Sequence, residues 1–304
     1  MDQRPSSAEG HVSATDFRFE AAPSPFELDR AIDAYIPLLQ ACYALARRQP
    51  IALPAGYVSL GEVRASVQEM VAAVESAPAP VREAIRNDME AAAGIADPGA
   101  FGFVIREEAT GAILVCIRGT QTPREWLANF TAVPNDFSLV PGFGLVHLGF
   151  EQMYGRVRES IQNALAATAA DVRITVLGHS LGGAMATLGA VDIKRNLGKR
   201  RVDLCTMGGP RVGKSIFRRN FNEEIPVAFR VTNQFDIVPH VPSVVLAWQH
   251  VGEEIEVDGN VDNPHSLDAY LQGLQNIGAP RELSAAGVIA EAAAAPWVVS
   301  IRVP

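Results

Sequence analysis

The chain has 304 residues, 48% hydrophobic and 20% charged, which suits one large α/β domain with appendages and excludes a disordered chain. The net charge of −8 gives no basic surface for nucleic acid, and no run of about 18 apolar residues predicts a transmembrane segment. Cys42, Cys116 and Cys205 are an odd number, and the last two lie in apolar runs, so we expect buried free thiols rather than a disulfide framework.

The N-terminal part of the chain predicts a loose tail followed by helices. Residues 1–23 are polar and lack an apolar leader, so the cytoplasm is the simplest expected location, with secretion not excluded. A capping box at Ser24–Glu27 predicts a helix that runs toward Arg48, and Pro37 is a candidate kink within it. A second capping box, Ser59 with Glu62, predicts another helix, and a third should begin near Val81. We therefore expect a helical extension over residues 24–95.

Strands and helices alternate in the remainder of the chain, which predicts a mostly parallel central sheet with helices on both faces. Strands are expected at residues 101–106, 112–117, 174–177, 202–207, 227–232 and 248–251. A helix follows Phe150, and its expected inner face carries Met153, Val157, Ile161 and Leu165. The fold class is thus α/β, as one domain over residues 24–304 with a catalytic core at 100–278 and a C-terminal appendage at 279–304.

The segment Gly178-His-Ser-Leu-Gly182 has the G-x-S-x-G pattern of a nucleophile elbow. An apolar strand run precedes it and a helical pattern follows it, with Gly183 as a further small residue. Side chains at positions 178 and 182 would collide with the neighbouring strand and helix, so the sharp turn requires glycine there. The pattern predicts that Ser180 is a catalytic nucleophile.

Asp236 is the candidate acid for this serine. In sheets with such an elbow, the acid and the histidine follow the serine on loops after later strands. Asp236 comes directly after the strand expected at 227–232, whereas Asp203 lies inside a strand and Asp192 inside the helix after the elbow. We expect both of those aspartates to point elsewhere.

Three histidines follow Asp236, and His265 is the best candidate base among them. His240 shares the loop of Asp236, and His250 lies in the strand expected at 248–251. His265 lies in a proline-containing loop that runs into a helix, from which it can reach across to Ser180. His265 would take the serine proton and return it to the leaving alcohol, while Asp236 holds its tautomer.

The oxyanion donors are expected at two turns. The backbone N–H of Leu181 begins the helix after the serine, where the helix dipole favours negative charge. Thr120 ends an earlier strand in Arg118-Gly119-Thr120 and offers a second N–H. We expect His147 and His179 to be structural supports around the elbow rather than direct participants.

Five motifs in one order resemble the fungal-type, class 3 lipase family of the α/β-hydrolase fold. They are Ile117–Thr120, Val146–Phe150, Gly178–Gly183, Gly209–Gly213 and Asn233–Pro239. The resemblance implies the triad Ser180, Asp236 and His265, with Thr120 and Leu181 at the oxyanion hole. It also implies a short lid helix at 122–130, where Thr122 and Pro123 suit a helix start and Trp126, Leu127 and Phe130 form an apolar cluster. The alternative is a surface helix that packs permanently on the core.

The sequence therefore predicts a serine carboxylic-ester hydrolase of the triacylglycerol lipase type. The substrate would be an acylglycerol or another lipid ester, met at a lipid–water interface by the lid. The alternatives are a phospholipase A1 or an esterase for soluble esters with the same triad, and a hydrolase-fold protein that binds a lipid or a partner without catalysis. No metal or organic cofactor is implied, because no cysteine and histidine ligand cluster occurs in the sequence.

Overall fold

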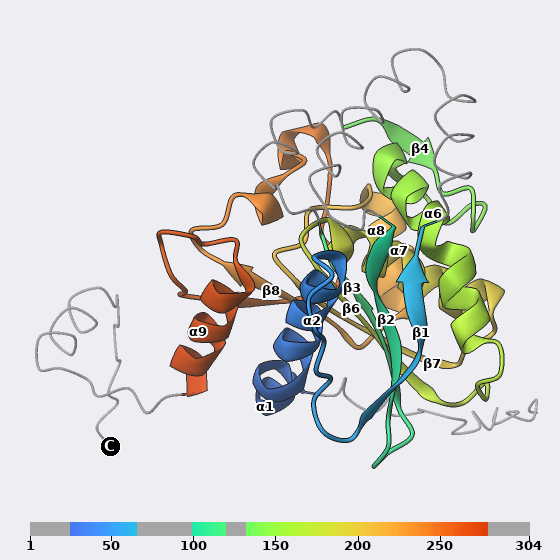
Figure 1. Ribbon diagram of the computed structural model, residues 1–304. Coiled ribbons are helices and arrows are strands. Elements are labelled where there is room, and N and C mark those ends of the chain that lie inside the picture. The colour runs from blue at the N-terminus through green and yellow to red at the C-terminus, as the bar shows by residue number, and fades with distance from the viewer. Residues whose placement is uncertain (1–24, 66–98, 120–131, 279–304) are drawn as a thin grey trace, which may run out of the picture.

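A seven-stranded sheet forms the centre of the computed structural model (Figure 1). The structure describes residues 25–65, 99–119 and 132–278. The strands lie in the order β1 (Tyr57–Arg64), β2 (Ala100–Glu107), β3 (Ile113–Ile117), β6 (Arg173–His179), β7 (Arg201–Met207), β8 (Ala228–Asn233) and β9 (Glu253–Val257). The pairs β1–β2 and β2–β3 are antiparallel, and every pair from β3 to β9 is parallel. A small antiparallel hairpin, β4 (Pro134–Asp136) with β5 (Leu145–His147), stands apart. The predicted mostly parallel sheet is confirmed.

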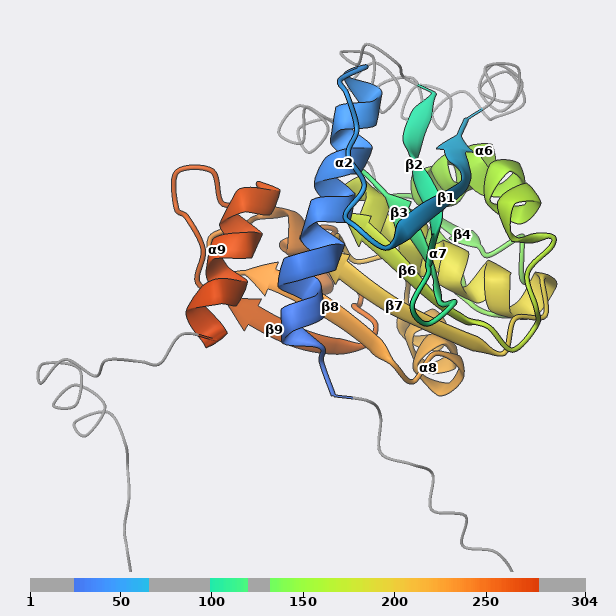
Figure 2. The same cartoon turned by 60° about the horizontal axis from the view of Figure 1, so that its bottom comes forward.

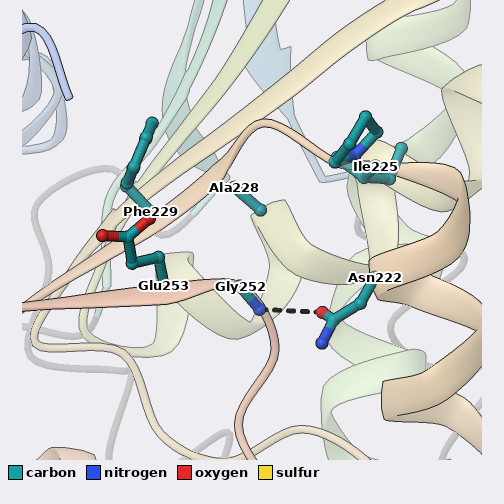
Figure 3. A pocket seen from close by; sticks show the side chains of 7 residues that line it. Asn222, Ile225, Ala228, Phe229, Gly252 and Glu253 are labelled. Carbon is teal, nitrogen blue, oxygen red and sulfur yellow. Dashed lines mark hydrogen bonds between the residues drawn. The ribbon is translucent and has the colours of Figure 1, made fainter. Parts of the chain in front are cut away.

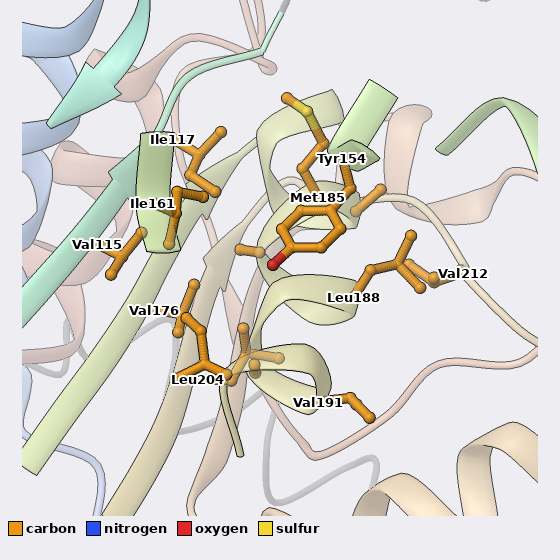
Figure 4. Close-up of a cluster of buried hydrophobic side chains, with 14 of the residues drawn as sticks. Val115, Ile117, Tyr154, Ile161, Val176, Met185, Leu188, Val191, Leu204 and Val212 are labelled. Atoms are coloured by element: carbon orange, nitrogen blue, oxygen red, sulfur yellow. The ribbon is translucent and has the colours of Figure 1, made fainter. Parts of the chain in front are cut away.

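Helices α6 (Leu148–Leu165) and α7 (Leu181–Asn196) cover one face of the sheet. Their apolar side chains and those of the central strands form one buried cluster, part of which Figure 4 shows. The predicted inner face of the first of these helices, Met153, Val157, Ile161 and Leu165, is buried in this cluster. Helix α8 (Ser215–Glu224) adds Phe217 and Phe221 to the same side.

The N-terminal helix covers the opposite face together with α9 (Leu267–Gly278), as Figure 2 shows. It consists of α1 (Leu28–Arg30), a π-helical turn (Ala31–Tyr35) and α2 (Ile36–Ala46). Pro37 cannot donate a backbone hydrogen bond, and the widened turn before it lets the helix continue without a break. The predicted helix is confirmed, and α2 packs on β2 and β3.

The three cysteines are buried free thiols, as predicted. Cys42 lies in α2, Cys116 in β3 and Cys205 in β7. Burial raises the pKa of the Cys205 thiol to about 12, so this thiol stays protonated.

Two predicted elements are wrong. Ser59 and Glu62 do not cap a helix, because the backbone from Tyr57 to Arg64 pairs with β2 as an edge strand of which Val63 alone is buried. Sheet pairing of the backbone outweighs a local capping signal, so the extension is not wholly helical. Nor is 248–251 a strand: the chain there makes one isolated bridge, from Gln249 to Gly213, and the edge strand β9 begins afterwards at Glu253.

Several predicted segments lie outside the described residues. They are the tail at 1–23, the helix expected from Val81, the oxyanion residue Thr120, the lid at 122–130 and the C-terminal appendage at 279–304.

Candidate active site

Ser180 lies at a sharp turn between the central strand β6 and the helix α7. Its backbone has φ 59° and ψ −132°, a conformation that an L-residue other than glycine rarely adopts. The side chain is fully buried, and the next residue already begins the helix. These features are those of the predicted nucleophile elbow.

The two glycines of the motif are required by close backbone approach. A Cβ atom at Gly178 would lie 2.2 Å from the carbonyl oxygen of Gly182. A Cβ atom at Gly182 would lie 2.2 Å from the carbonyl oxygen of Ile117 in β3. The predicted collisions with the strand and the helix are confirmed.

Asp236 lies in the turn after β8 and is buried. Its Oδ1 accepts a hydrogen bond from the backbone N–H of Val238 at 3.0 Å, and its Oδ2 accepts one from the Tyr270 hydroxyl at 2.7 Å. Burial and the nearby Asp236 carboxylate raise the pKa of Tyr270, so this hydroxyl remains a donor. The carboxylate is thus held in one orientation.

The structure brings His265 to Asp236, with Nδ1 of the ring 2.6 Å from Oδ2 of the carboxylate. The loop that carries His265 is held by Asn233 at the end of β8. The amide of Asn233 donates to the carbonyl of Pro264 at 2.8 Å and accepts from the N–H of Gly259 at 3.2 Å. An acid that orients an imidazole through Nδ1 leaves Nε2 as the atom that can act as base.

The two atoms expected to exchange a proton are Oγ of Ser180 and Nε2 of His265. Both are buried, and neither has a hydrogen-bond partner in the part of the chain that the structure describes. The serine–histidine bond is therefore not formed here. Such bonds are often long without a ligand and tighten when substrate is bound.

The other candidate acids and bases, Asp203, Asp192, His250 and His240, take no part in the hydrogen bond between Asp236 and His265. Asp203 binds Arg173, and Asp192 binds Arg158 and Tyr154 in the packing of α6 on α7. The ring of His250 bonds the carbonyl of Pro239 at 2.7 Å. His240 is exposed in the 3₁₀ helix Val238–His240, and His147 caps α6 by accepting from the N–H of Phe150.

The first N–H groups of α7 lack acceptors within the helix, and Ser180 is the residue that immediately precedes them. Leu181 is its first residue, as the oxyanion prediction requires. Gly119 lies against this turn: a Cβ atom there would be 2.5 Å from Cβ of Ser180 and 3.0 Å from N of Leu181. Thr120, the second predicted donor, lies outside the described residues.

Sequence reasoning did not find three residues that shape this site. Tyr270 and Asn233 hold the acid and the base loop, and Gly208 leaves room for both. A Cβ atom at Gly208 would lie 2.8 Å from the Tyr270 hydroxyl and 3.0 Å from Oδ2 of Asp236. No local pattern marks these residues, because each acts only through contacts between distant segments.

Exposed apolar side chains gather on the loops that follow β8, the strand that leads to Asp236. Val244 to Leu246 form a short 3₁₀ helix in which Val245 is 88% exposed. The full set is Phe235, Ile237, Val244, Val245 and Leu246.

A cavity of about 240 Å³ lies away from this site (Figure 3). Its lining includes Ala228 and Glu253, the first residues of β8 and β9, whereas Asp236 follows the other end of β8. Asn222 closes one side by accepting a hydrogen bond from the N–H of Gly252 at 2.9 Å. This cavity therefore lies at the opposite end of β8 from Asp236 and is not part of the candidate active site.

Within residues 25–65, 99–119 and 132–278, no group of three or more histidine, cysteine or acidic side chains could hold a metal ion. In the same ranges, no helix is long and apolar enough to cross a membrane.

Comparison with known proteins agrees with the geometry. A family model described as lipase (class 3) matches residues 114–246, a span that contains Ser180 and Asp236 and ends before His265. The secreted mono- and diacylglycerol lipase 1 of Fusarium solani is 34% identical over 185 residues, covering 59% of this chain and 55% of the relative. The phospholipase A1 EG1, chloroplastic/mitochondrial, of Oryza sativa subsp. indica is 30% identical over 227 residues, covering 59% and 52%.

This chain spans about half the length of the curated relatives that it matches. Among solved structures, the nonglycosylated LIP2 lipase of Yarrowia lipolytica is similar with a TM-score of 0.58 and 21% sequence identity. That match covers 78% of this chain and 82% of the other. At this identity the likeness concerns the fold, which is that of the α/β-hydrolases.

Proposed function

Since this chain belongs to the class 3 lipase family, we propose that it hydrolyses carboxylic esters of the acylglycerol type through an acyl-enzyme on Ser180. The observation that carries the proposal is the pair of buried Asp236 and partly buried His265, joined at 2.6 Å, beside a serine with elbow backbone geometry. A carboxylate, an imidazole and a serine so arranged can perform nucleophilic acyl transfer.

In the first half of the reaction, Oγ of Ser180 attacks the ester carbonyl carbon while Nε2 of His265 takes the serine proton. The carbonyl oxygen becomes an oxyanion that accepts a hydrogen bond from the N–H of Leu181, with Thr120 as the expected second donor. The bond to the alcohol oxygen then breaks, and His265 gives its proton to the leaving alcohol. Asp236 stabilises the imidazolium that exists between these transfers.

In the second half, a water molecule gives a proton to His265 as its oxygen attacks the acyl carbon. The second tetrahedral intermediate breaks the bond to Oγ, and Ser180 recovers its proton from His265. A carboxylic acid is released. Asp236 retains its orientation throughout, because Tyr270 and Val238 both donate to it.

Lipid esters are the proposed substrate class. The exposed apolar side chains Phe235, Ile237, Val244, Val245 and Leu246 would contact acyl chains or a lipid surface. The segment 122–130 would act as the lid, and its apolar cluster would face the lipid on opening. Activity should rise when a short-chain triacylglycerol passes its solubility limit.

A phospholipase A1 activity is the second candidate, favoured by the likeness to the rice phospholipase A1. The chemistry at Ser180 is the same, and only the group esterified beside the attacked acyl chain differs. Release of fatty acid from phosphatidylcholine labelled at one glycerol position, compared with release from a triacylglycerol, separates the two activities. An esterase that acts only on soluble esters would hydrolyse neither emulsion.

Titration of acid released from a tributyrin emulsion tests the proposal. The wild-type chain should release butyrate, and Ser180→Ala should release none above background. Ser160→Ala is the matched control, because the Ser160 hydroxyl donates to the carbonyl of Val157 within α6, outside the site. Full activity in Ser180→Ala, or no hydrolysis of any ester by the folded wild type, would overturn the proposal.

The cellular location stays a prediction. The expected location is the cytoplasm, with secretion not excluded, whereas the Fusarium relative is named a secreted lipase. Immunoblotting of cell lysate and culture medium would decide between the two.

A further inference from the structure

A chain of hydrogen bonds runs from the N-terminal helix through the site to the backbone of the base. The hydroxyl of Tyr43, in α2, accepts from the N–H of Gly119 at 3.0 Å and lies 2.7 Å from Nδ1 of His179. Nε2 of His179 lies 2.9 Å from the carbonyl oxygen of His265. Four segments that are distant in sequence are thus joined at one tyrosine and one histidine.

The direction of each bond in this chain follows from the chemistry of its ends. A carbonyl oxygen only accepts, so Nε2 of His179 must carry the proton and donate it to His265. Burial and the neighbouring His265 hold the pKa of His179 well below its usual range, so the ring is neutral and Nδ1 is an acceptor. The Tyr43 hydroxyl therefore donates to His179 and accepts from Gly119.

Both ends of this series of hydrogen bonds lie next to the reacting groups. Gly119 lies against Cβ of Ser180 and the N–H of Leu181, so its position shapes the space beside the nucleophile. At the other end, the His179 ring stacks on the His265 ring with centroids 4.8 Å apart and planes inclined by 32°. A neutral His179 does not repel the imidazolium that forms on His265.

We propose that Tyr43 is a positioning residue for the hydrolysis, a role that rests on the proposed function. Through one hydroxyl it aligns the backbone beside the nucleophile and, by way of His179, the base. Tyr43 does not contact the reacting atoms itself, and its effect falls on the transition state rather than on substrate binding. His179, expected only to support the elbow, is the second member of this arrangement.

Tyr43→Phe tests the role by removing one oxygen atom from a partly buried side chain. For a soluble ester such as p-nitrophenyl butyrate, kcat should fall by about 10- to 100-fold with KM within about twofold of wild type. Binding of butaneboronic acid, whose adduct with serine carries a negative oxygen, should weaken by a similar factor. Tyr154→Phe is the matched control, because Tyr154 is a buried tyrosine that donates to Asp192 at 2.8 Å in the α6–α7 packing. Its kcat should stay at the wild-type value.

His179→Gln provides a second variant that does not depend on the folding of Tyr43→Phe. The glutamine amide nitrogen can take the place of Nε2 and donate to the carbonyl of His265, but glutamine then has no atom at the place of Nδ1, the acceptor for Tyr43. We expect it to reproduce the loss in kcat. The double variant with Tyr43→Phe should have a kcat no lower than that of the less active single variant.

A folded Tyr43→Phe with kcat within twofold of wild type would overturn this role while leaving the hydrolase proposal intact. So would losses that add in the double variant. A wild-type chain that hydrolyses no ester would instead overturn the proposed function, and this role with it.

Discussion

Gly208 is the position at which the proposed acid–base geometry is easiest to disturb. Its φ is +61°, and the three atoms nearest to an added Cβ belong to Tyr270, Asp236 and His265, at 2.8, 3.0 and 3.2 Å. Gly208→Ala should therefore do two things. The left-handed backbone would cost about 1–2 kcal/mol of stability, and the methyl group would push the acid and its partners apart by roughly half an ångström.

The catalytic consequence follows from the sensitivity of proton transfer to geometry. A misplacement of about 1 Å can cost about 100-fold in rate, so a shift of half that size should lower kcat by about tenfold or more. Gly198→Ala separates this effect from backbone strain. Gly198 has φ +63°, but nothing lies within 4 Å of its added Cβ.

Both variants should thus lose stability in thermal unfolding, Gly208→Ala more than Gly198→Ala because of its added contacts, while kcat on p-nitrophenyl butyrate falls only in Gly208→Ala. Equal kcat in the two variants, measured well below both melting temperatures, would refute the placement of Asp236 and His265 beside Gly208.

Three further predictions concern the base, the response to acid and the lipid surface. His265→Ala should lose nearly all turnover in the same ester assay, whereas His240→Ala and His250→Ala should keep most of it; comparable losses in all three would refute the choice of base. Burial, with a contribution from Arg230, lowers the pKa of His250 from 6.5 to about 4, so the unfolded chain binds its proton first as the pH falls. The contribution of this group to the free energy of unfolding should be fully present above pH 6.5 and decline toward pH 4, by about 3 kcal/mol at most. In urea unfolding, the stability of His250→Gln should decline less steeply with falling pH than that of the wild type; the same dependence on pH in both would contradict this assignment. Val245→Asp should lower hydrolysis of emulsified tributyrin several-fold while leaving p-nitrophenyl butyrate unaffected; equal loss on both substrates would indicate damage to the site instead of the lipid-contacting surface.

The parts of the site that sequence could predict are those encoded locally. The elbow around Ser180 needs glycines at fixed spacing between a strand and a helix, and that requirement is visible in a single stretch. Asp236 follows a recognisable strand, so its place at the carboxyl ends of the parallel strands could also be predicted. The choice of His265 used loop context alone, and its hydrogen bond to Asp236 agrees with that choice.

The parts that sequence could not predict depend on pairing and packing between distant segments. Ser59 and Glu62 have a good capping pattern, but β2 supplies backbone partners that make the segment a strand. The strand β9 carries three glutamates among its five residues, Glu253 to Val257, and only pairing with β8 identifies it. Tyr43 is one of several apolar and aromatic residues in its helix, and nothing local distinguishes it. Its proposed role depends on contacts with Gly119 and His179, which are distant from it in sequence.

Labelling with a fluorophosphonate, followed by mass spectrometry of the peptides, tests the central claim most directly. The folded protein should gain one adduct, on the oxygen of Ser180, and Ser180→Ala should gain none. The adduct should form much more slowly in His265→Ala, because the base no longer takes the serine proton. A folded wild-type protein whose Ser180 stays unmodified under mild conditions would contradict the account.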